Sequence, residues 1–452
     1  MGTVGYSGAT AAESAARPWR APRAMGPLDH TLALPGSKSL TARELVLSAL
    51  GDRPTRIRRP LHSRDSRLMI DALRALGVRI EEVPGDGAFG PDLLVTPRPL
   101  EGPATIDGGL AGTVLRFIAP LAALATGHVH VDGDEAARRR PMRPVIDAIR
   151  RLGVEVADDD GHIPFDVRGT GRVTGGDLQI DASESSQFVS ALLLAAPRFS
   201  RGLTLRHVGS RLPSQPHIAM TLACLRARGV TAETVEPGLW RVEPGPIGGG
   251  EVEIEPDLSN AAPFLAAALI AGGRVSITGW PATTTQVGDS LREILPRYGA
   301  EVRLEEDLLT VLAPGIAAGR LPAVDLDLSE GGELAPTFAA LAALGAAPAE
   351  LDGIGHLRGH ETDRLSALVH DLEIVGVRAV ALDDGLLVRA DATRELRGGR
   401  WACYGDHRMA TTGALIGLAV DGVELDDVAT TSKTLPQFPE LWAALVASGG
   451  RA

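Results

Sequence analysis

Lysine is nearly absent from this 452-residue chain, and its two lysines are the first residues that suggest chemistry. Lysine and arginine total 45, and only Lys38 and Lys433 are lysines, which leaves 43 arginines. Arginine replaces lysine readily on a solvated surface, but not where a compact ammonium that can give up its proton is required. Codon bias would explain the depletion, but not the positions of the two survivors. We therefore expect both lysines to act chemically.

Lys38 lies at the start of a predicted helix in the segment LPGSKSLTAR, residues 34–43. The residues Pro35, Gly36 and Ser37 form a turn before it, and Arg43 follows within the helix. A helix N-terminus exposes unpaired backbone N–H groups and the positive end of the helix dipole, and both favour anions. The segment therefore predicts an anion-binding site.

Composition and charge restrict the ligand and the compartment. The chain is 44% hydrophobic and 23% charged, as expected of a globular protein with two or three domains. Its net charge of −12 argues against a nucleic-acid or membrane-surface partner, so we expect a small anionic substrate. Cys224 and Cys403 show neither metal-ligand spacing nor a disulfide framework, which indicates the reducing cytoplasm. No apolar run reaches the roughly 20 residues of a membrane span, and residues 1–17 are expected to be a disordered tail.

The elements that position these residues form a repeat. Predicted helices end in a capping glycine at intervals of 76, 76, 70, 77 and 73 residues, at Gly77, Gly153, Gly229, Gly299, Gly376 and Gly449. All but the last are followed by a predicted strand, such as 154–157 or 301–304. Upstream of each glycine lies a second, almost wholly apolar helix, at 45–50, 114–125, 188–196, 261–271, 334–344 and 409–420. A helix that is apolar on all sides is a buried helix.

Polar residues open the buried helices with the same spacing. Taken as equivalent starts, they are separated by 73, 74, 73, 74 and 74 residues: Ser39, Gly112, Ser186, Ser259, Glu333 and His407. Plain N-caps would explain Ser, Thr or Asp at these positions, and for residues 257–260 that interpretation stays open. Cations follow three of the six starts, where the helix dipole disfavours them, so we expect those three to bind a ligand.

Six units of about 74 residues predict an α/β (α+β) fold. We expect two groups of three units, with sheets outside and the apolar helices inside; a one-dimensional solenoid is the alternative.

Seven short motifs then identify a family. They are LPGSKS at 34–39, AGTVLRF at 111–117, RRP at 139–141, SSQF at 185–188, HETDR at 360–364, DHRMA at 406–410 and TTSKTLP at 430–436. Each is weak alone, but seven in the same order and at matching intervals are strong. With them, the chain from about Trp19 onward closely resembles the 3-phosphoshikimate 1-carboxyvinyltransferase family of aromatic amino-acid and chorismate synthesis.

The resemblance implies a two-domain inside-out α/β barrel built from six βαβαββ repeats, with the active site in the interdomain cleft. Domain I would comprise residues 18–35 and 256–452, and domain II residues 36–255. The implied reaction transfers the enolpyruvyl group of phosphoenolpyruvate to the 5-hydroxyl of shikimate 3-phosphate and releases phosphate, by addition and elimination. We expect no cofactor, no metal, no nucleic-acid or membrane partner, and a cytoplasmic monomer.

The resemblance also assigns the site. The residues for shikimate 3-phosphate are Lys38, Ser39, Arg43, Ser185, Ser186, Gln187, Ser214, Glu333, His356 and His360. Those for phosphoenolpyruvate are Lys38, Gly112, Arg140, Gln187, Arg364, Arg408 and Lys433. The catalytic residues are Lys38, Glu333, Glu361, His407 and Lys433.

The implied roles follow the chemistry. Arg43 would bind the shikimate carboxylate, and the serines its phosphate, while Gly112 stays small so that a ligand can approach the backbone. Glu333 would act near the hydroxyl and Glu361 near the methylene carbon, since acid and base work needs two groups in different protonation states. His407 is a candidate donor to phosphate or an orienting group.

Four residues depart from the commonest bacterial pattern. Glu333 replaces aspartate, His360 lysine, His356 asparagine and His217 tyrosine. Because histidine loses its charge near neutral pH, we predict that shikimate 3-phosphate affinity falls more steeply from pH 6 to 8 than in a His360→Lys variant.

Two other functions stay open. The sister enzymes that use UDP-N-acetylglucosamine commonly carry a cysteine in the loop corresponding to residues 132–142 and a Lys-Asn start, whereas this loop has no cysteine and the start is Lys38-Ser39. A non-catalytic repeat scaffold would not be expected to gather both lysines at one set of helix ends. For glyphosate, the inhibitor associated with the family, Gly112 leaves room, while Phe117 stands where proline is common.

Overall fold

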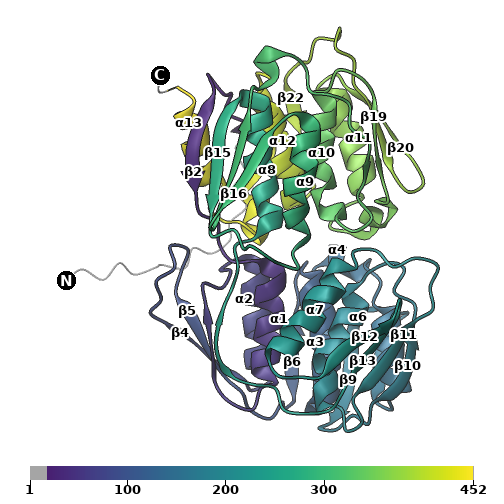
Figure 1. Ribbon diagram of the computed structural model, residues 1–452. Helices are drawn as coiled ribbons and strands as arrows, with labels where there is room; N and C mark the ends of the chain where they lie inside the picture. The colour runs from purple at the N-terminus through teal and green to yellow at the C-terminus, as the bar shows by residue number, and fades with distance from the viewer. Residues whose placement is uncertain (1–17, 451–452) are drawn as a thin grey trace.

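The computed structural model describes residues 18–450, so the predicted tail at 1–17 lies outside the described residues. It shows two lobes, stacked one above the other in Figure 1 and called here the upper and the lower lobe. Each lobe has its own hydrophobic core, one running from Ala42 to Ile254 and the other combining Ala21–Leu34 with Leu258–Leu445. Within the described residues, no helix is long and apolar enough to cross a membrane.

The lower lobe contains three units in chain order. The first comprises α1 (Lys38–Ala49), β3 (Thr55–Arg58), α2 (Arg64–Ala75), β4 (Arg79–Val83) and β5 (Asp92–Thr96). The second comprises β6 (Ala104–Asp107), α3 (Gly112–Leu124), β7 (Thr126–Asp132), α4 (Glu135–Arg138), α5 (Arg143–Arg151), β8 (Glu155–Asp159) and β9 (His162–Thr170). The third comprises β10 (Gly176–Ile180), α6 (Gln187–Ala195), η1 (Ala196–Arg198), β11 (Leu203–His207), α7 (Pro216–Ala227), β12 (Ala232–Glu236) and β13 (Leu239–Val242), and β14 (Gly250–Glu253) leads out.

The upper lobe begins with β1 (Trp19–Arg20) and β2 (Leu28–Leu32) and resumes after β14. Its fourth unit comprises α8 (Leu258–Ala271), β15 (Gly273–Thr278), η2 (Val287–Ser290), α9 (Leu291–Ile294), η3 (Leu295–Tyr298), β16 (Glu301–Glu305), β17 (Leu308–Ala313) and η4 (Ile316–Ala318). The fifth comprises β18 (Leu326–Asp327), η5 (Gly332–Leu334), α10 (Ala335–Ala343), β19 (Ala349–Asp352), η6 (Gly355–Gly359), α11 (Arg364–Ile374), β20 (Arg378–Ala381) and β21 (Leu386–Arg389). The last comprises β22 (Gly399–Trp401), α12 (His407–Gly417), β23 (Val423–Leu425), η7 (Val428–Lys433) and α13 (Phe438–Ser448).

Among the described residues the strands form six small sheets, one for each unit. The order β6-β7-β9-β8 shows the pattern: β6 and β7 are parallel and joined by α3, and β9 is antiparallel to both β7 and β8. Three of the described strands pair far from their sequence neighbours: β14 lies parallel to β3, β2 lies parallel to β15, and β1 lies antiparallel to β23. The last two pairings bring β2 and β1 into the upper lobe.

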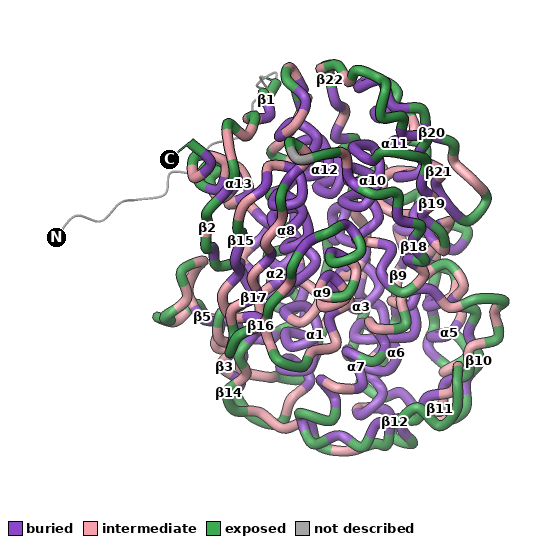
Figure 2. The backbone as a smooth tube through the Cα atoms, turned by 45° about the horizontal axis from the view of Figure 1, so that its top comes forward, coloured by how far each residue is buried: buried purple, intermediate pink, exposed green. Residues whose placement is uncertain are grey.

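The six apolar helices lie inside, as their composition predicts. Every residue of α12 is buried, as are all residues of α8 except the last, and in Figure 2 these inner helices are largely purple, while green marks strands, loops and the outer sides of helices such as α2. The strands alternate instead: in β9, Ile163, Phe165 and Val167 point inward. The expected α/β architecture, with helices inside and sheets outside, is therefore confirmed.

The six predicted capping glycines all lie at helix ends, and five of them are left-handed. Gly77, Gly153, Gly229, Gly299 and Gly376 have φ between 81° and 96°, the left-handed conformation that closes a helix. Gly449 also caps its helix, α13, as predicted, but with a φ of −77°.

The lobes are joined by two adjacent chain segments. Ser37 N donates to Glu255 O at 2.8 Å, and Asp257 N donates to Pro35 O at 2.9 Å. A side chain at Gly36 would meet Arg59 O at 2.3 Å, so this crossing requires glycine.

Candidate active site

The helix starts of both lobes surround a cavity that is partly open to solvent. It lies between the lobes, and every site residue predicted from the sequence except Lys433 lines it. From the lower lobe these are Lys38, Ser39, Arg43, Gly112, Arg140, Ser185, Ser186, Gln187 and Ser214. From the upper lobe they are Glu333, His356, His360, Glu361, Arg364, His407 and Arg408.

Lys38 is positioned by the first turn of α1. The Ser37 side chain caps the helix by accepting a hydrogen bond from Leu40 N, which leaves Lys38 as the first helical residue. The backbone N–H of Lys38 donates to Asp257 of the upper lobe at 3.0 Å. The helix start is therefore attached to both lobes, and its ammonium lines the cavity.

Arg43 is held by three oxygens of helices α1 and α7. It donates to Thr221 Oγ1 at 2.9 Å, to Ser39 O at 2.8 Å and to His217 O at 2.9 Å. Burial lowers the pKa of this arginine to about 10, which still leaves it charged at neutral pH. A fixed, charged guanidinium at the cavity wall is suited to a carboxylate.

Gly112 and two arginines form the next part of the wall. A methyl group at Gly112 would lie 2.9 Å from Nη1 of Arg140 and 3.1 Å from Nη1 of Arg116, so the glycine leaves space for the guanidinium groups as well as for a ligand. Arg116 donates to Gln187 Oε1 at 2.8 Å and lies over the Phe188 ring. Burial, and then the neighbouring charge of Arg140, lower the pKa of Arg116 to about 9.

The predicted serines lie at two other helix starts. Ser185 Oγ accepts a hydrogen bond from Gln187 N at 3.3 Å, and Ser186 precedes the first residue of α6. Ser214 has a φ of 53°, which is uncommon for a residue with a side chain, and its N–H donates to Ser329 O of the upper lobe. The hydroxyl groups therefore line the cavity close to where the lobes meet.

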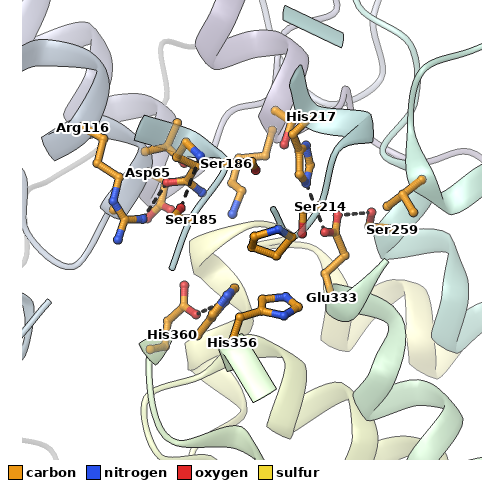
Figure 3. Close-up of a pocket in the computed structure, with 18 of the residues that line it drawn as sticks. Asp65, Arg116, Ser185, Ser186, Ser214, His217, Ser259, Glu333, His356 and His360 are labelled. Carbon is orange, nitrogen blue, oxygen red and sulfur yellow. Dashed lines mark hydrogen bonds and ion pairs between the residues drawn. The ribbon is translucent and has the colours of Figure 1, made fainter. Parts of the chain in front are cut away.

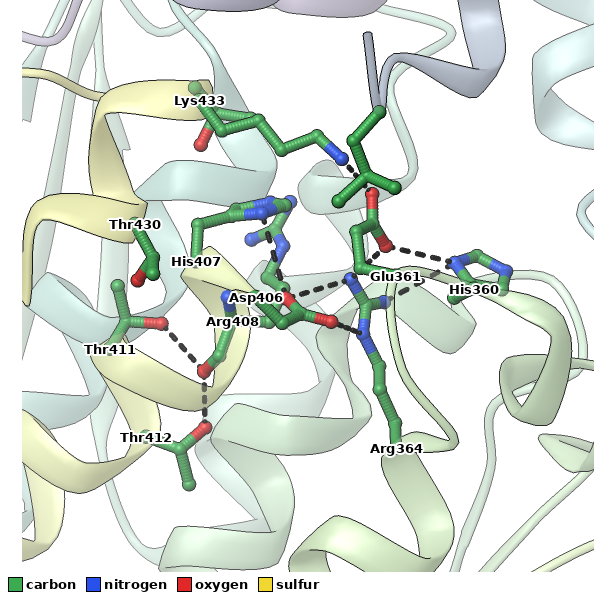
Figure 4. Close-up of polar contacts among 12 residues, drawn as sticks. His360, Glu361, Arg364, Asp406, His407, Arg408, Thr411, Thr412, Thr430 and Lys433 are labelled. Atoms are coloured by element: carbon green, nitrogen blue, oxygen red, sulfur yellow. Dashed lines mark hydrogen bonds and ion pairs between the residues drawn. The ribbon is translucent and has the colours of Figure 1, made fainter. Parts of the chain in front are cut away.

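A charge network occupies the upper-lobe side (Figure 4). Arg364 donates to both oxygens of buried Asp406, at 2.7 and 3.2 Å, and to Glu361 Oε2 at 3.0 Å. Lys433 is 2% exposed and forms an ion pair with the other oxygen of Glu361. Lys433 thus reaches the cavity through Glu361 rather than lining it.

Protonation in this network is set by two opposing effects. Burial alone would raise the pKa of Glu361, but the charges of Lys433 and Arg364 outweigh it and hold that pKa well below its usual range. Burial lowers the pKa of Lys433, against the attraction of Glu361. Glu361 is therefore ionised. It accepts a hydrogen bond from the ammonium of Lys433, which gives up its proton more readily than an ordinary lysine.

Three of the four histidines that line the cavity have pKa values below the usual one. Burial lowers the pKa of His356 to about 4, and burial followed by neighbouring arginine charge lowers those of His360 and His407 well below the usual value. The lowered pKa of His360 argues against a titration of this side chain between pH 6 and 8, and the pH dependence of affinity stays a prediction. The sequence showed the histidine but not its position beside Arg364.

Glu333 receives hydrogen bonds from both lobes (Figure 3). Ser259 Oγ donates to its Oε1 at 2.9 Å, and His217 Nε2 lies 3.1 Å from its Oε2. Burial would raise the pKa of Glu333, but the charge and hydrogen bond of His217 and the charge of Arg408 hold it well below its usual range. The carboxylate is therefore ionised and able to accept a proton.

Uncompensated positive charge is the main electrostatic feature of the cavity. Within residues 18–450, five cations that line it have no carboxylate within ion-pair distance: Lys38, Arg43, Arg116, Arg140 and Arg408. The four arginines are no more than 8% exposed. Buried charge without a partner is costly, so the cavity is built for a ligand that carries several negative charges.

The predicted site set omits several lining residues, among them Arg116 and Asp65. Arg116 follows Gly112 by four positions, the spacing that places both on one face of α3, and it is the cation that marked this helix start as a ligand site in the sequence. Asp65 lies in the first turn of α2, where its buried Oδ1 has no hydrogen-bond partner and lies 3.7 Å from Arg64 Nη2, and its sequence context is that of an ordinary capped helix.

No group of three or more His, Cys, Asp or Glu side chains suited to a metal ion occurs in the part of the chain that is described.

The fold and the cleft together define a class: a two-lobed α/β protein of repeated units whose anion site is completed by both lobes. Solved structures share this fold, including EPSP synthase from Acinetobacter baumannii (TM-score 0.75, 22% identity, 95% of this chain and 97% of the other). The enolpyruvyl transferase NikO from Streptomyces tendae has a TM-score of 0.73 at 19% identity, over 95% of this chain and 98% of the other.

The sequence comparisons identify the family within that class. The family profile described as EPSP synthase (3-phosphoshikimate 1-carboxyvinyltransferase) matches residues 22–442. The 3-phosphoshikimate 1-carboxyvinyltransferase of Kocuria rhizophila is 56% identical over 439 residues, which cover 96% of this chain and 97% of the relative. The chain belongs to the EPSP synthase family, and the resemblance seen in its seven motifs is confirmed.

Proposed function

We propose that the protein transfers the enolpyruvyl group of phosphoenolpyruvate to the 5-hydroxyl of shikimate 3-phosphate and releases phosphate. The observation that carries the proposal is the set of five unpaired cations in one interlobe cavity of a protein whose net charge is −12. Both substrates carry a phosphate and a carboxylate, so together they supply the missing negative charges. The family membership of the chain supports the same reaction.

Shikimate 3-phosphate is assigned to the lower-lobe wall. Arg43 would bind its carboxylate, because this guanidinium is fixed by three hydrogen bonds and has no ion-pair partner among the described residues. Ser185, Ser186 and Ser214 would bind its phosphate. This places the 5-hydroxyl toward Glu333 of the upper lobe.

Phosphoenolpyruvate is assigned to the space among Lys38, Arg140, Arg364 and Arg408. Gly112 allows its approach, and the guanidinium groups would fix its carboxylate and phosphate. Its negative charge would also weaken the hold of Lys433 and Arg364 on Glu361. The pKa of Glu361 then rises toward the range in which it can donate a proton.

The addition step needs two proton transfers in one cleft. The 5-hydroxyl gives its proton to Glu333 while its oxygen bonds to C2 of phosphoenolpyruvate, and Glu361 protonates the methylene carbon. In the elimination step the bond from C2 to the phosphate oxygen breaks and the methyl carbon returns a proton to the carboxylate of Glu361. Lys38 and Lys433 stabilise the departing phosphate, and neutral His407 is available as a donor to it.

The domain boundaries, oligomeric state and location are part of this proposal. Domain boundaries between residues 35 and 36 and between residues 255 and 256 are supported by the two separate hydrophobic cores and by the two hydrogen-bonded segments that cross between the lobes. A monomer is supported because one chain supplies both walls of the cavity. A cytoplasmic location is supported by the two free, buried thiols, Cys224 and Cys403.

The test measures phosphate release from phosphoenolpyruvate in three reactions: with shikimate 3-phosphate, with UDP-N-acetylglucosamine, and without an acceptor. Release that requires shikimate 3-phosphate, and that persists in EDTA, is the expected result. Release only with UDP-N-acetylglucosamine would assign the sister reaction, and no release would favour a scaffold. Loss of activity in EDTA would contradict the expected independence from metal.

A further inference from the structure

His217 makes a contact that the proposed reaction does not explain. It is the second residue of α7 in the lower lobe, whereas Glu333 lies in η5 of the upper lobe, 116 positions away. Its Nε2 lies 3.1 Å from Glu333 Oε2, and Figure 3 shows the ring and the carboxylate pointing toward each other across the cavity. Both side chains are only slightly exposed, 16% and 20%.

The two hydrogen bonds of Glu333 differ in what they depend on. Ser259, at the start of α8, belongs to the same lobe as Glu333, so its bond to Oε1 persists whatever the lobes do. The bond to Oε2 crosses between the lobes and exists only while they are closed. With Ser259 alone, the carboxylate can turn about its single remaining contact.

The backbone of His217 is fixed to the acceptor side of the cavity. Its carbonyl oxygen accepts hydrogen bonds from Arg43 at 2.9 Å and from Thr221 Oγ1 at 2.9 Å, and its N–H donates to Ser214 O at 3.1 Å. Arg43 and Ser214 are residues assigned to shikimate 3-phosphate. The imidazole therefore projects toward Glu333 from the wall that would hold the acceptor.

We propose that His217 is a positioning residue, which donates from Nε2 to Glu333 in the closed protein and so aims the proton-accepting carboxylate at the acceptor hydroxyl. This rests on the proposed function. Because an ionised carboxylate only accepts hydrogen bonds, Nε2 must carry the proton in this contact. The charged or titratable groups facing the pair are Arg43 from α1, His356 and His360 around η6, Arg364 from α11 and Arg408 from α12.

The test compares His217→Phe, which removes the donor, with His217→Gln, which keeps an N–H near the same place. The substitution to Phe is expected to lower kcat roughly 10- to 100-fold, the loss for a hydrogen bond to a charged group. Both KM values are expected to stay within about threefold, because the contact acts on the proton transfer rather than on substrate binding. The substitution to Gln is expected to recover most of kcat.

Two controls separate positioning from general loosening. Arg211→Ala breaks the ion pair to Asp384, which crosses between the same lobes at 2.6 Å but does not touch Glu333, and it should leave kcat within about twofold. In a Glu333→Gln background, His217→Phe should add almost no further loss, because two residues that act through one contact are not additive.

An unchanged kcat in His217→Phe, equal losses in the Phe and Gln variants, or an equal loss in Arg211→Ala would each overturn the inference. These outcomes require an active parent enzyme and so leave the proposed function intact. A parent enzyme that releases no phosphate with shikimate 3-phosphate would overturn both. Thermal unfolding of each variant confirms that the fold is retained.

Discussion

The two lysines of the chain have different partners, and this difference bears on their chemistry. Lys433 is nearly inaccessible and paired with Glu361, so its ammonium can pass a proton within that pair. Lys38 lines the cavity and forms no ion pair within residues 18–450. Its charge is available to a ligand, and the helix start beneath it adds backbone N–H groups.

Lys38→Arg is predicted to fold normally and lose most activity. Arginine keeps the charge but replaces a compact ammonium by a broad, permanently protonated fork, which cannot occupy the same position beside the phosphate. Loss of one well-placed electrostatic contact in the transition state typically costs about 100-fold or more in kcat. The measurement is kcat by phosphate release together with the melting temperature; retained turnover would contradict the role of Lys38.

Gly112→Ala is predicted to act through the neighbouring arginines. The new methyl group would lie 2.9 Å from Arg140 Nη1, and since a guanidinium is the far end of a flexible side chain, it can shift without unfolding the protein. A displaced guanidinium no longer donates two parallel hydrogen bonds to the same anionic group, so the KM for phosphoenolpyruvate should rise about tenfold. The KM for shikimate 3-phosphate should hardly change. Equal increases in both KM values would show that the glycine serves a different purpose.

At the scale of elements, the sequence predicted what depends on local pattern. The six buried helices were predictable because each is apolar on all sides, and polar residues mark their starts: α12 begins at His407 and α3 at Gly112, both as predicted. The pairing of β14 with β3 and the contact between His217 and Glu333 were not predictable from the pattern. They join residues more than 100 positions apart, and only the packed fold brings them together. The roles of Glu333 and Glu361 depended on the family resemblance, because an isolated glutamate carries no signal of its own.

Helix α11 contains a second element-scale feature, the buried carboxylate of Asp371. Its Oδ1 lies near Ala402 N, Tyr404 Oη and His370 Nδ1, while its Oδ2 is buried without a partner. Burial is the main cause that raises the pKa of Asp371 to about 6. Because the same helix begins with Arg364 and the segment 402–406 leads into α12, this carboxylate lies between two elements of the site.

Asp371→Asn is predicted to stabilise the protein above pH 6 relative to the parent. With the folded pKa above the unfolded value, the folded parent binds more protons, so its stability falls as the pH rises from about 4 to 6. Asparagine keeps the carbonyl oxygen as an acceptor and does not ionise. The free energy of unfolding of Asp371→Asn minus that of the parent should increase by roughly 1–3 kcal/mol between pH 4.5 and pH 7.5. Urea denaturation of both proteins at both pH values measures this difference. A difference between the two proteins that does not vary with pH would contradict the buried ionisation.

At the scale of the whole molecule, the two lobes have separate cores but share one site. They are joined by the two adjacent crossing segments and by a few contacts at the cavity, including His217 with Glu333 and Arg211 with Asp384. Two cores linked in this way are expected to unfold in two transitions, since all-or-none unfolding applies to single domains. The site, by contrast, needs both lobes closed.

A matched pair of core substitutions tests this independence. Leu192 of α6 and Leu269 of α8 are equally buried, one in each core. Replacing either by Ala should destabilise its own lobe by about 2–5 kcal/mol and lower one of two calorimetric transitions by roughly 5–15 °C, without moving the other. A single transition that shifts equally in both variants would show that the lobes unfold as one unit.

Ligand binding should then couple the two transitions. Shikimate 3-phosphate is assigned to the lower-lobe wall with its hydroxyl at Glu333 of the upper lobe, so it binds only when both lobes are folded and closed. At about 100 times its dissociation constant it should add about 2.7 kcal/mol to the stability of the closed state, and the two transitions should move upward and approach each other. Shikimate without the phosphate is the control, because it lacks the group that the serines would bind. If shikimate 3-phosphate raised only the lower-lobe transition, it would be bound by one wall of the cavity, and the hydroxyl would not reach Glu333.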